Sequence, residues 1–435
     1  MADGAACGTG QGPARGHLAA AVLLAVSALA AQCALRPGVF AGETVNSRLA
    51  TVYALVHDHS WRIDRPPESP PNPFEQTVDR VRVDGRILSS KPPLLPALMT
   101  AEYAVLRALA GWDLADPDTL KPFLLLVIFS LCQLPFAAAV VLFAMALRFF
   151  LPDRVSWLFL VAVFAFATPL FGYAAQLNNH VPAVAALCAC FYVAAGVVTG
   201  GILPAGPHYL LFGFCWGLAF ALDLPSAVFP AMLLPFLLLR GGMRAAVWTG
   251  MGLAPPLAAH FGMMLAATGS LMPVQTRPEA YMFEASLWRH PLGIDGLNEP
   301  RAVYLFHAVA GRFGLFSLFP VTLLGLCGAA ASLRGRGRPA FVWACMAAFA
   351  ALTAYYVTST NNYGGASYGF RWHLCAVPAL LLAAAPALAR PRGWRFWGTV
   401  ALLCAVSLWS SWECLQAPWG VCHEWTCRWV FGPAV

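Results

Sequence analysis

Residues 123–147 read FLLLVIFSLCQLPFAAAVVLFAMAL and contain no charged side chain. As an α-helix this run is long enough to cross the hydrocarbon core of a bilayer, which takes about 20 apolar residues. The whole chain has 435 residues, of which 59% are hydrophobic and 11% are charged. A soluble domain carries roughly 25% charged residues. Because strand-like alternation is absent, the backbone must satisfy its hydrogen bonds as helix, and we expect an all-α polytopic membrane protein.

Basic residues gather in short clusters between the apolar runs, and these clusters predict the topology. They are Arg148 with Arg154, Arg240 with Arg244, Arg334 with Arg336 and Arg338, and Arg390 with Arg392 and Arg395. Arginines beside membrane spans stay on the cytoplasmic side. Placing every cluster inside gives eleven crossings, at 18–35, 121–147, 155–176, 181–200, 207–222, 224–239, 245–267, 314–333, 339–357, 371–389 and 396–412. The net charge of +7 is then a feature of topology, and no nucleic-acid partner is expected.

This topology divides the chain into three parts in a plasma (inner) membrane. Residues 1–16 are a cytoplasmic N-terminus, 17–412 the transmembrane domain, and 413–435 an extracytoplasmic tail rich in Trp and Cys. The first span is expected to be a retained anchor, although Ala28-Leu29-Ala30 resembles a signal-peptide cleavage site. The outer face carries the loops 36–120, 268–313 and 358–370, so most of the unusual polar residues lie there.

The first outer loop is expected to contain two helices at the membrane surface. Apolar residues recur at helical spacing from Thr44 to His57, which predicts a short amphipathic helix resting on the membrane. The segment from Pro92 to Gly111 is apolar enough to span, but counting it as a crossing would place the later arginine clusters outside. Its Glu102 and Arg107 suit a juxtamembrane helix.

This loop also supplies candidate catalytic residues. Glu43 lies beside the end of the first span, where a carboxylate could take a proton from an attacking hydroxyl group, and Asp64 and Asp79 are further candidates. Lys91 precedes two prolines at headgroup level, where its ammonium suits a phosphate. The alternative is that the acids are merely solvated and that the lysine only reaches up to the interface.

A second informative stretch, NNYGGASYGFRWH, occupies residues 361–373. Arg371 lies on the side opposite the other arginine clusters, and its guanidinium could grip a phosphate. Aromatic rings here offer faces for a sugar, or they form an interfacial belt. The residues expected to line a substrate site are Arg48, Asn179, His180, Tyr363, Tyr368 and Trp372.

These stretches resemble a known family. The order of these motifs resembles that in membrane proteins related to the GT-C superfamily of glycosyltransferases. The motifs are an acid after the first span, W-x-I-D at 61–64, D-x4-D-G-R-x-x-S-x-K-P-P-L at 79–94 and N-Y-G-G-x-S-Y-G-F-R-W at 362–372. The K-P-P-L element at 91–94 is the most specific shared piece. The resemblance covers most of residues 15–390, although between the motifs it rests on the order of the spans.

The resemblance implies a GT-C-like bundle that transfers a sugar, with inversion, from a polyprenyl-phosphate donor at the outer membrane face. A loop carboxylate, carried over to Glu43, would be the base, and Lys91 and Arg371 would hold the donor phosphate. The acceptor is left open, as is a divalent cation as cofactor. Three features depart from the family. Relatives tend to carry an aspartate, or an Asp-Glu pair, near the end of the first span, where this chain has Glu43 and Asn46. The turn Asn178-Asn179-His180 stands where relatives often have an acid, and no large soluble C-terminal domain is expected after the last span.

Other functions remain as alternatives. A transporter or flippase of a lipid-linked or small solute would be expected to show inverted repeats and buried charges, and here His260 is the main ionisable residue within a span. An inactive GT-C-like protein, or a docking protein that uses the outer loop, are further alternatives. In the tail, Cys422 and Cys427 could form a disulfide in an oxidising exterior. The cysteine spacings predict no metal site.

Overall fold

The apolar run at 123–147 lies within one continuous helical segment. In the computed structural model, α4 (Pro117–Ile128) passes through a π-helical turn at Phe129–Gln133 into α5 (Leu134–Leu147). Gln133, at the end of that turn, is buried and donates a hydrogen bond from Nε2 to Oε1 of Gln32 at 3.3 Å. Because Gln32 belongs to α1 (Gly12–Leu35), this pair of amides ties two apolar helices together. The structure describes residues 12–39, 42–65, 68–335, 338–360, 362–390, 392–420 and 422–432.

The other predicted crossings also coincide with helical segments. These are α1; α6 (Arg154–Phe166) with α7 (Pro169–Ala174); α8 (His180–Thr199); α9 (Gly206–Leu222); the 3-10 turn Leu224–Ala227 and α10 (Val228–Thr268); α12 (Leu315–Leu318), the turn Pro320–Leu323 and α13 (Leu324–Ser332); α14 (Pro339–Ser359); the turn Arg371–Ala376, α15 (Val377–Ala383) and α16 (Ala385–Leu388); and α17 (Trp394–Gln416).

Among the described residues, seven helices are long and apolar enough to cross a membrane, and three shorter apolar helices lie beside them. The long segment 224–268 counts as one of the seven, but it holds two predicted crossings. It bends at Gly242, whose φ of 52° lies in the left-handed region that glycine adopts without strain. The chain is thus the polytopic all-α protein that the sequence predicts, and eleven crossings stay a prediction.

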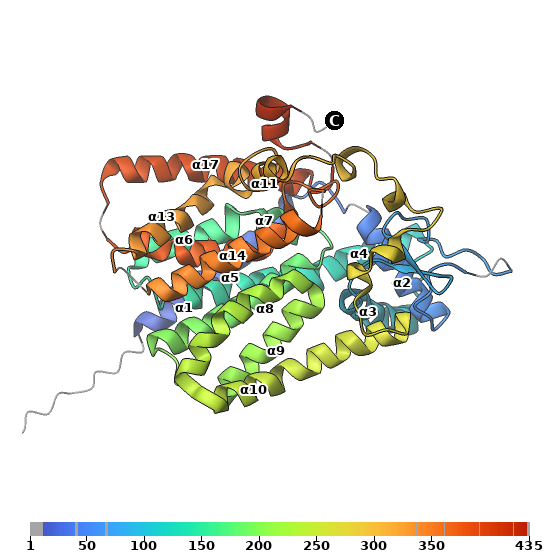
Figure 1. Cartoon of the computed structure of the whole chain (residues 1–435), viewed down its shortest axis with the longest axis horizontal. Coiled ribbons are helices and arrows are strands. Elements are labelled where there is room, and N and C mark those ends of the chain that lie inside the picture. Colours follow the sequence, from blue (N-terminus) through green and yellow to red (C-terminus); the bar gives the residue numbers. More distant parts are fainter. Residues whose placement is uncertain are drawn as a thin grey trace, which may run out of the picture.

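The two ends of the bundle differ in character (Figure 1). Toward the left end in this view lie the bend of α10, the end of α13 and the start of α17, and each is next to a predicted basic cluster. Arg336, a member of one of these clusters, lies outside the described residues. At the right end lie α2 (Glu43–His57) and α3 (Leu94–Ala110) of the first loop. The arrangement matches the predicted separation of arginine clusters from large loops.

The first loop contains a β-hairpin that the sequence analysis did not predict. Strands β1 (Arg80–Val83) and β2 (Arg86–Ser89) pair antiparallel, and Asp84 and Gly85 turn between them with φ of 48° and 75°. Two consecutive positive φ values are typical of the type I′ turn that joins tight hairpins. Ser47 of α2 donates from Oγ to the carbonyl oxygen of Asp79 at 2.6 Å, so the hairpin is fixed to α2.

Helix α2, which the sequence predicts to rest on the membrane, is packed inside the first loop. Nearly all of its residues from Val45 to Ala54 are buried, because α3 and the hairpin cover it. The predicted juxtamembrane segment does form a helix, α3, which buries Met99 and Tyr103 and exposes Val105 and Leu109. That exposed apolar face agrees with the predicted place of α3 at the interface.

The second loop and the tail complete the face around the hairpin. The loop contains short 3-10 turns at 274–276, 278–281, 287–289 and 293–295, followed by α11 (Arg301–Val309). After α17 the tail runs along the 362–372 loop, and its π-helical turn at Cys427–Phe431 lies above α11 in Figure 1.

Candidate active site

A cavity of about 890 Å³ lies between the first loop, the second loop, the 362–372 loop and the tail. Eight of the residues predicted to form the site line it, namely Glu43, Arg48, Asp79, Lys91, Asn179, His180, Arg371 and Trp372. Its size suits a small organic ligand with room to spare, since typical ligand pockets run from about 300 to 1,000 Å³.

Lys91 and Asp79 meet in this cavity as an ion pair, with 2.7 Å between Nζ and Oδ2. The hairpin explains why they meet. Arg80 pairs with Ser89, so the residues just beyond these strand ends lie side by side, and Ser90 donates from its backbone nitrogen to the carbonyl oxygen of Asp79 at 3.1 Å. Burial, together with repulsion from Arg371 and Arg48, lowers the pKa of Lys91 to about 8 although Asp79 opposes the shift.

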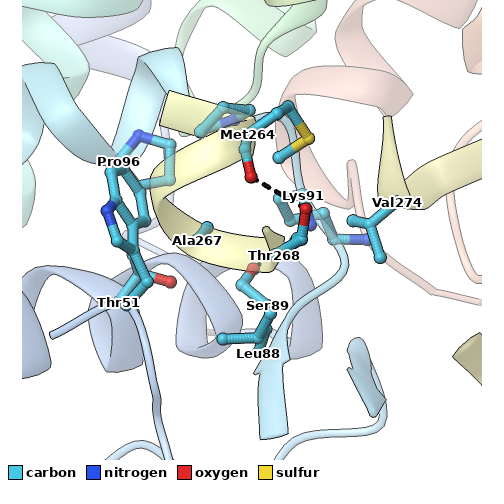
Figure 2. A pocket seen from close by; sticks show the side chains of 11 residues that line it. Thr51, Leu88, Ser89, Lys91, Pro96, Met264, Ala267, Thr268 and Val274 are labelled. Carbon is cyan, nitrogen blue, oxygen red and sulfur yellow. Dashed lines mark hydrogen bonds between the residues drawn. The ribbon is translucent and has the colours of Figure 1, made fainter. Parts of the chain in front are cut away.

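Lys91 also borders a second, much smaller pocket of about 20 Å³ (Figure 2). Figure 2 shows its largely apolar wall around the lysine, made by side chains that include Pro96, Met264, Ala267 and Val274. The methylene stem of Lys91 thus lies in apolar surroundings while its ammonium reaches Asp79. The apolar wall covers the stem of Lys91 and Asp79 pairs with its charge, so the side chain can be buried here.

Arg48 lies on the buried face of α2, where its side chain is held by two acceptors. Nη1 donates to the carbonyl oxygen of Thr44 at 2.7 Å, and Nη2 donates to Oδ1 of Asn179 at 2.8 Å. Asn179 is anchored in turn, because its Nδ2 donates to the carbonyl oxygen of Leu222 at 2.9 Å. Burial is the main cause that lowers the pKa of Arg48 to about 10, with a contribution from the charge of Arg371.

Arg371 is the third cation of the cavity. Its side chain makes no hydrogen bond or ion pair with any residue that the structure describes, and its Nε is buried without a partner. The guanidinium carbon lies 5.3 Å from the centre of the Trp419 ring. Because Arg371 lowers the pKa of both Lys91 and Arg48, the three cations repel one another across the cavity, and an anion bound among them would relieve that repulsion.

His180 and Asp223 form a buried pair at another part of the cavity wall. Nδ1 of His180 lies 2.9 Å from Oδ2 of Asp223, and the same oxygen accepts a hydrogen bond from the thiol of Cys375 at 3.1 Å. Asp223 thus fixes the orientation of the imidazole ring. Trp372 lies on the same wall and stacks on Tyr356, with 4.5 Å between the ring centres.

The carboxylates of the cavity differ in how they are paired. Glu43 accepts a hydrogen bond at Oε2 from the backbone nitrogen of Val78 at 2.8 Å, and its Oε1 has no hydrogen-bond partner among the described residues. Asp79 is neutralised by Lys91. Asp295 was missed by the sequence analysis; burial raises its pKa, and its Oδ1 is buried with no partner in the described part of the chain.

Three predicted site residues lie outside the lining. Asp64 accepts from Nε of Arg62 at 2.9 Å and from the backbone nitrogen of Ile87 at 2.9 Å, so it ties the loop to the hairpin. Tyr363 donates to Glu299. Tyr368 donates to Oε2 of Glu413 at 2.8 Å. Both tyrosines are buried, because the tight 362–372 loop turns their rings into the protein. Neither ring lines the cavity, and a contact of either tyrosine with substrate stays a prediction.

The structure adds lining residues that the sequence gave little reason to choose. The second loop contributes Tyr281, Trp288 and Asp295, and the tail contributes Trp419. The density of tryptophan in the tail was the only available signal for Trp419. Within the described ranges, no group of three or more His, Cys, Asp or Glu side chains is arranged to hold a metal ion.

Comparison with solved structures identifies the fold. ArnT from Cupriavidus metallidurans bound to undecaprenyl phosphate superimposes with a TM-score of 0.51 at 14% identity, over 90% of this chain and 63% of that one. The archaeal oligosaccharyltransferase AglB from Archaeoglobus fulgidus, in complex with an inhibitory peptide and a dolichol-phosphate, gives 0.48 at 13% identity, over 93% and 56%. No protein-family model matches the sequence, and the search of curated proteins finds no match.

The likeness to ArnT confirms the predicted GT-C-like membrane fold. This chain spans 63% of the length of that ArnT, and at 14% identity the likeness concerns the fold alone.

Proposed function

We propose that the protein is a membrane glycosyltransferase that moves a sugar from a polyprenyl-phosphate donor to an acceptor at the extracytoplasmic face. The observation that carries this proposal is that three cations, Arg48, Lys91 and Arg371, line one cavity. Asp79 pairs with Lys91, and Asp223 and Asp295 attract Arg371, but Arg371 has no ion-pair partner among the described residues. A phosphate that carries the sugar and the lipid is an anion of the required kind. The GT-C-like fold supports the same class of reaction.

In the proposed reaction, an acceptor hydroxyl attacks the anomeric carbon from the side opposite the phosphate. The bond between that carbon and the phosphate oxygen breaks, the phosphate keeps the electron pair, and the configuration inverts. The developing negative charge on the phosphate is stabilised by Lys91 and Arg371 and by the fixed guanidinium of Arg48. Glu43, with Oε1 open to the cavity, takes the acceptor proton.

The proposed orientation follows from charge. The basic clusters lie in the cytoplasm together with the N-terminus, so the cavity opens on the outer side of the plasma membrane. His180 and Trp372 face the same cavity and are proposed to contact the sugar or the acceptor. The steps above use no metal ion, and a divalent cation bound together with the donor phosphate is left open.

The test is a mass-spectrometric profile of polyprenyl-phosphate sugars in a deletion strain and in strains complemented with variants. Lys121 provides a matched control for Lys91, because it also precedes a proline but is exposed at the start of α4. We expect one lipid-linked sugar to accumulate in the deletion strain. Wild type and Lys121→Ala should clear it, whereas Lys91→Ala and Glu43→Gln should not.

Two results would overturn the proposal. If the deletion leaves every polyprenyl-phosphate sugar unchanged, the protein does not consume such a donor. If Lys91→Ala and Glu43→Gln clear the accumulated lipid as wild type does, the cavity is not the site of transfer. Accumulation of the lipid on the cytoplasmic side alone, measured in oriented vesicles, would indicate a flippase instead.

A further inference from the structure

The tail beyond α17 is built into the candidate active site. It crosses the 362–372 loop, where the backbone nitrogen of Tyr368 donates to the carbonyl oxygen of Pro418 at 3.0 Å and that of Gly420 donates to Ala366 at 3.2 Å. The backbone nitrogen of Gly369 donates to Oε1 of Glu424 at 2.6 Å. These bonds hold the tail against the loop that carries Arg371.

Trp419, between the first two of these contacts, lines the cavity. One neighbour of its ring is Arg371, with the guanidinium carbon 5.3 Å from the ring centre. Another is Tyr173, whose ring meets it edge-on at 5.5 Å. Tyr173 is itself fixed, because its hydroxyl donates to the carbonyl oxygen of Tyr368 at 2.9 Å. The indole is therefore held firmly beside the arginine.

The guanidinium of Arg371 makes few direct contacts besides the one with Trp419. It has no hydrogen-bond or ion-pair partner among the residues that the structure describes. Its stem lies close to Gly364, where an added Cβ would come within 3.2 Å of Cγ of Arg371 and where φ is +95°. Lys91 and Arg48 repel Arg371, whereas Asp223 and Asp295 attract it without forming an ion pair. The face of the Trp419 ring also attracts the cation, and it lies directly beside the guanidinium.

We propose that Trp419 is a positioning residue that holds Arg371 in the orientation needed to bind the donor phosphate. The inference rests on the proposed function, because it takes a lipid-linked phosphate as the ligand of Arg371. A long arginine side chain loses considerable rotamer freedom on binding a ligand. A ring that holds the side chain beforehand removes part of that loss, so the tail contributes to donor affinity without touching the reacting atoms.

The test measures the affinity of the full-length protein in lipid nanodiscs for undecaprenyl phosphate. Trp419→Leu keeps an apolar side chain but loses the ring, whereas Trp419→Phe keeps a ring. We expect Trp419→Leu to weaken binding by about twofold to thirtyfold, the range given by a cation–π contact, and Trp419→Phe to weaken it less. In combination with Arg371→Ala, Trp419→Leu should add almost nothing to the loss caused by Arg371→Ala.

The tail provides its own control. Trp429 is also stacked with an arginine, with the guanidinium carbon of Arg428 at 4.9 Å from its ring centre, but it is exposed and outside the cavity lining. Trp429→Leu should leave affinity unchanged. The inference is overturned if Arg371→Ala weakens binding while Trp419→Leu does not, if the two losses add in full, or if Trp419→Phe binds as poorly as Trp419→Leu. If Arg371→Ala itself binds normally, the proposed phosphate site fails, and this inference fails with it.

Discussion

The ammonium of Lys91 lies 2.7 Å from the carboxylate of Asp79, and yet the pKa of this lysine falls to about 8. Burial and the charges of Arg371 and Arg48 outweigh the attraction of the one carboxylate. The ion pair is therefore not a self-contained structural bridge. The ammonium of Lys91 loses its charge when the pH rises above about 8. A phosphate bound beside it would raise the pKa of Lys91 and so keep the ammonium charged.

This relationship predicts how donor binding depends on pH. Below a pKa of about 8 the ammonium is charged, and as pH rises through that value the charge disappears. We expect the affinity for undecaprenyl phosphate to fall as pH is raised from below 8 to above it. Lys91→Arg should remove that fall, because a guanidinium stays charged there. The same decline in Lys91→Arg would show that another group titrates.

Asp64 and Glu43 are predicted to behave differently when each loses its charge. Asp64→Asn breaks the pair with Arg62 in a half-exposed position, so we expect a loss of about 1 kcal/mol in the free energy of unfolding and little change in kcat.

Glu43→Gln should instead lower kcat by about 100- to 10,000-fold while the protein still binds the donor. Thermal unfolding and transfer assays on both variants separate these roles. A large fall in kcat for Asp64→Asn with normal stability would contradict the placement of Asp64 outside the site.

Glu424 is predicted to make stability depend on pH. Its side chain is fully buried, and burial raises its pKa from 4.5 to about 7. The folded state therefore binds a proton more tightly than the unfolded state. The contribution of Glu424 to the free energy of unfolding is greatest below pH 4.5, and it is lost as pH rises from 4.5 through 7. The loss is on the order of 3 kcal/mol, at about 1.4 kcal/mol per pKa unit. Glu424→Gln should flatten that slope in thermal unfolding at several pH values, whereas the exposed Glu279→Gln should leave it unchanged.

The tail thiols lead to a further prediction. Cys422 and Cys427 are in hydrogen-bond contact as thiols, and Cys427 is buried. At an oxidising face, exchange with an external disulfide would convert the pair to a disulfide and transfer two electrons and two protons to the oxidant. We expect intact-mass analysis of the purified protein to show the loss of two hydrogens, reversed by a thiol reductant. Cys422→Ser should abolish that change and Cys414→Ser should not; an unchanged mass in wild type under oxidising conditions would contradict the pairing.

Much of the fold could be predicted because its signals are local. Apolar runs and arginine clusters recur along the chain, and each predicted crossing coincides with helix. The hairpin also had a local signal, Asp84-Gly85 between short β-prone runs, which the sequence analysis overlooked. The burial of α2 had none, because it depends on which elements pack around it.

The site was harder to predict, since its geometry is set by contacts between distant segments. Lys91 and Arg371 could be chosen from their positions beside rigid or glycine-rich backbone, and both line the cavity. Asp64 sits in an equally suggestive motif but faces Arg62 and the hairpin. Asp295 and Trp419 stand in stretches without a recognisable motif, and only folding brings them to the cavity.

The lining of the cavity comes from segments that lie far apart in the sequence, and this affects how the site forms during biosynthesis. Lys91 lies in the first loop, whereas Arg371 and Trp419 belong to segments that are synthesised after most of the helices. The cavity therefore cannot be complete until these later segments have been made and have packed against the first loop. A chain that carries only the first loop holds Lys91 and Asp79 but lacks the Arg371 guanidinium and the Trp419 indole ring that line the finished cavity.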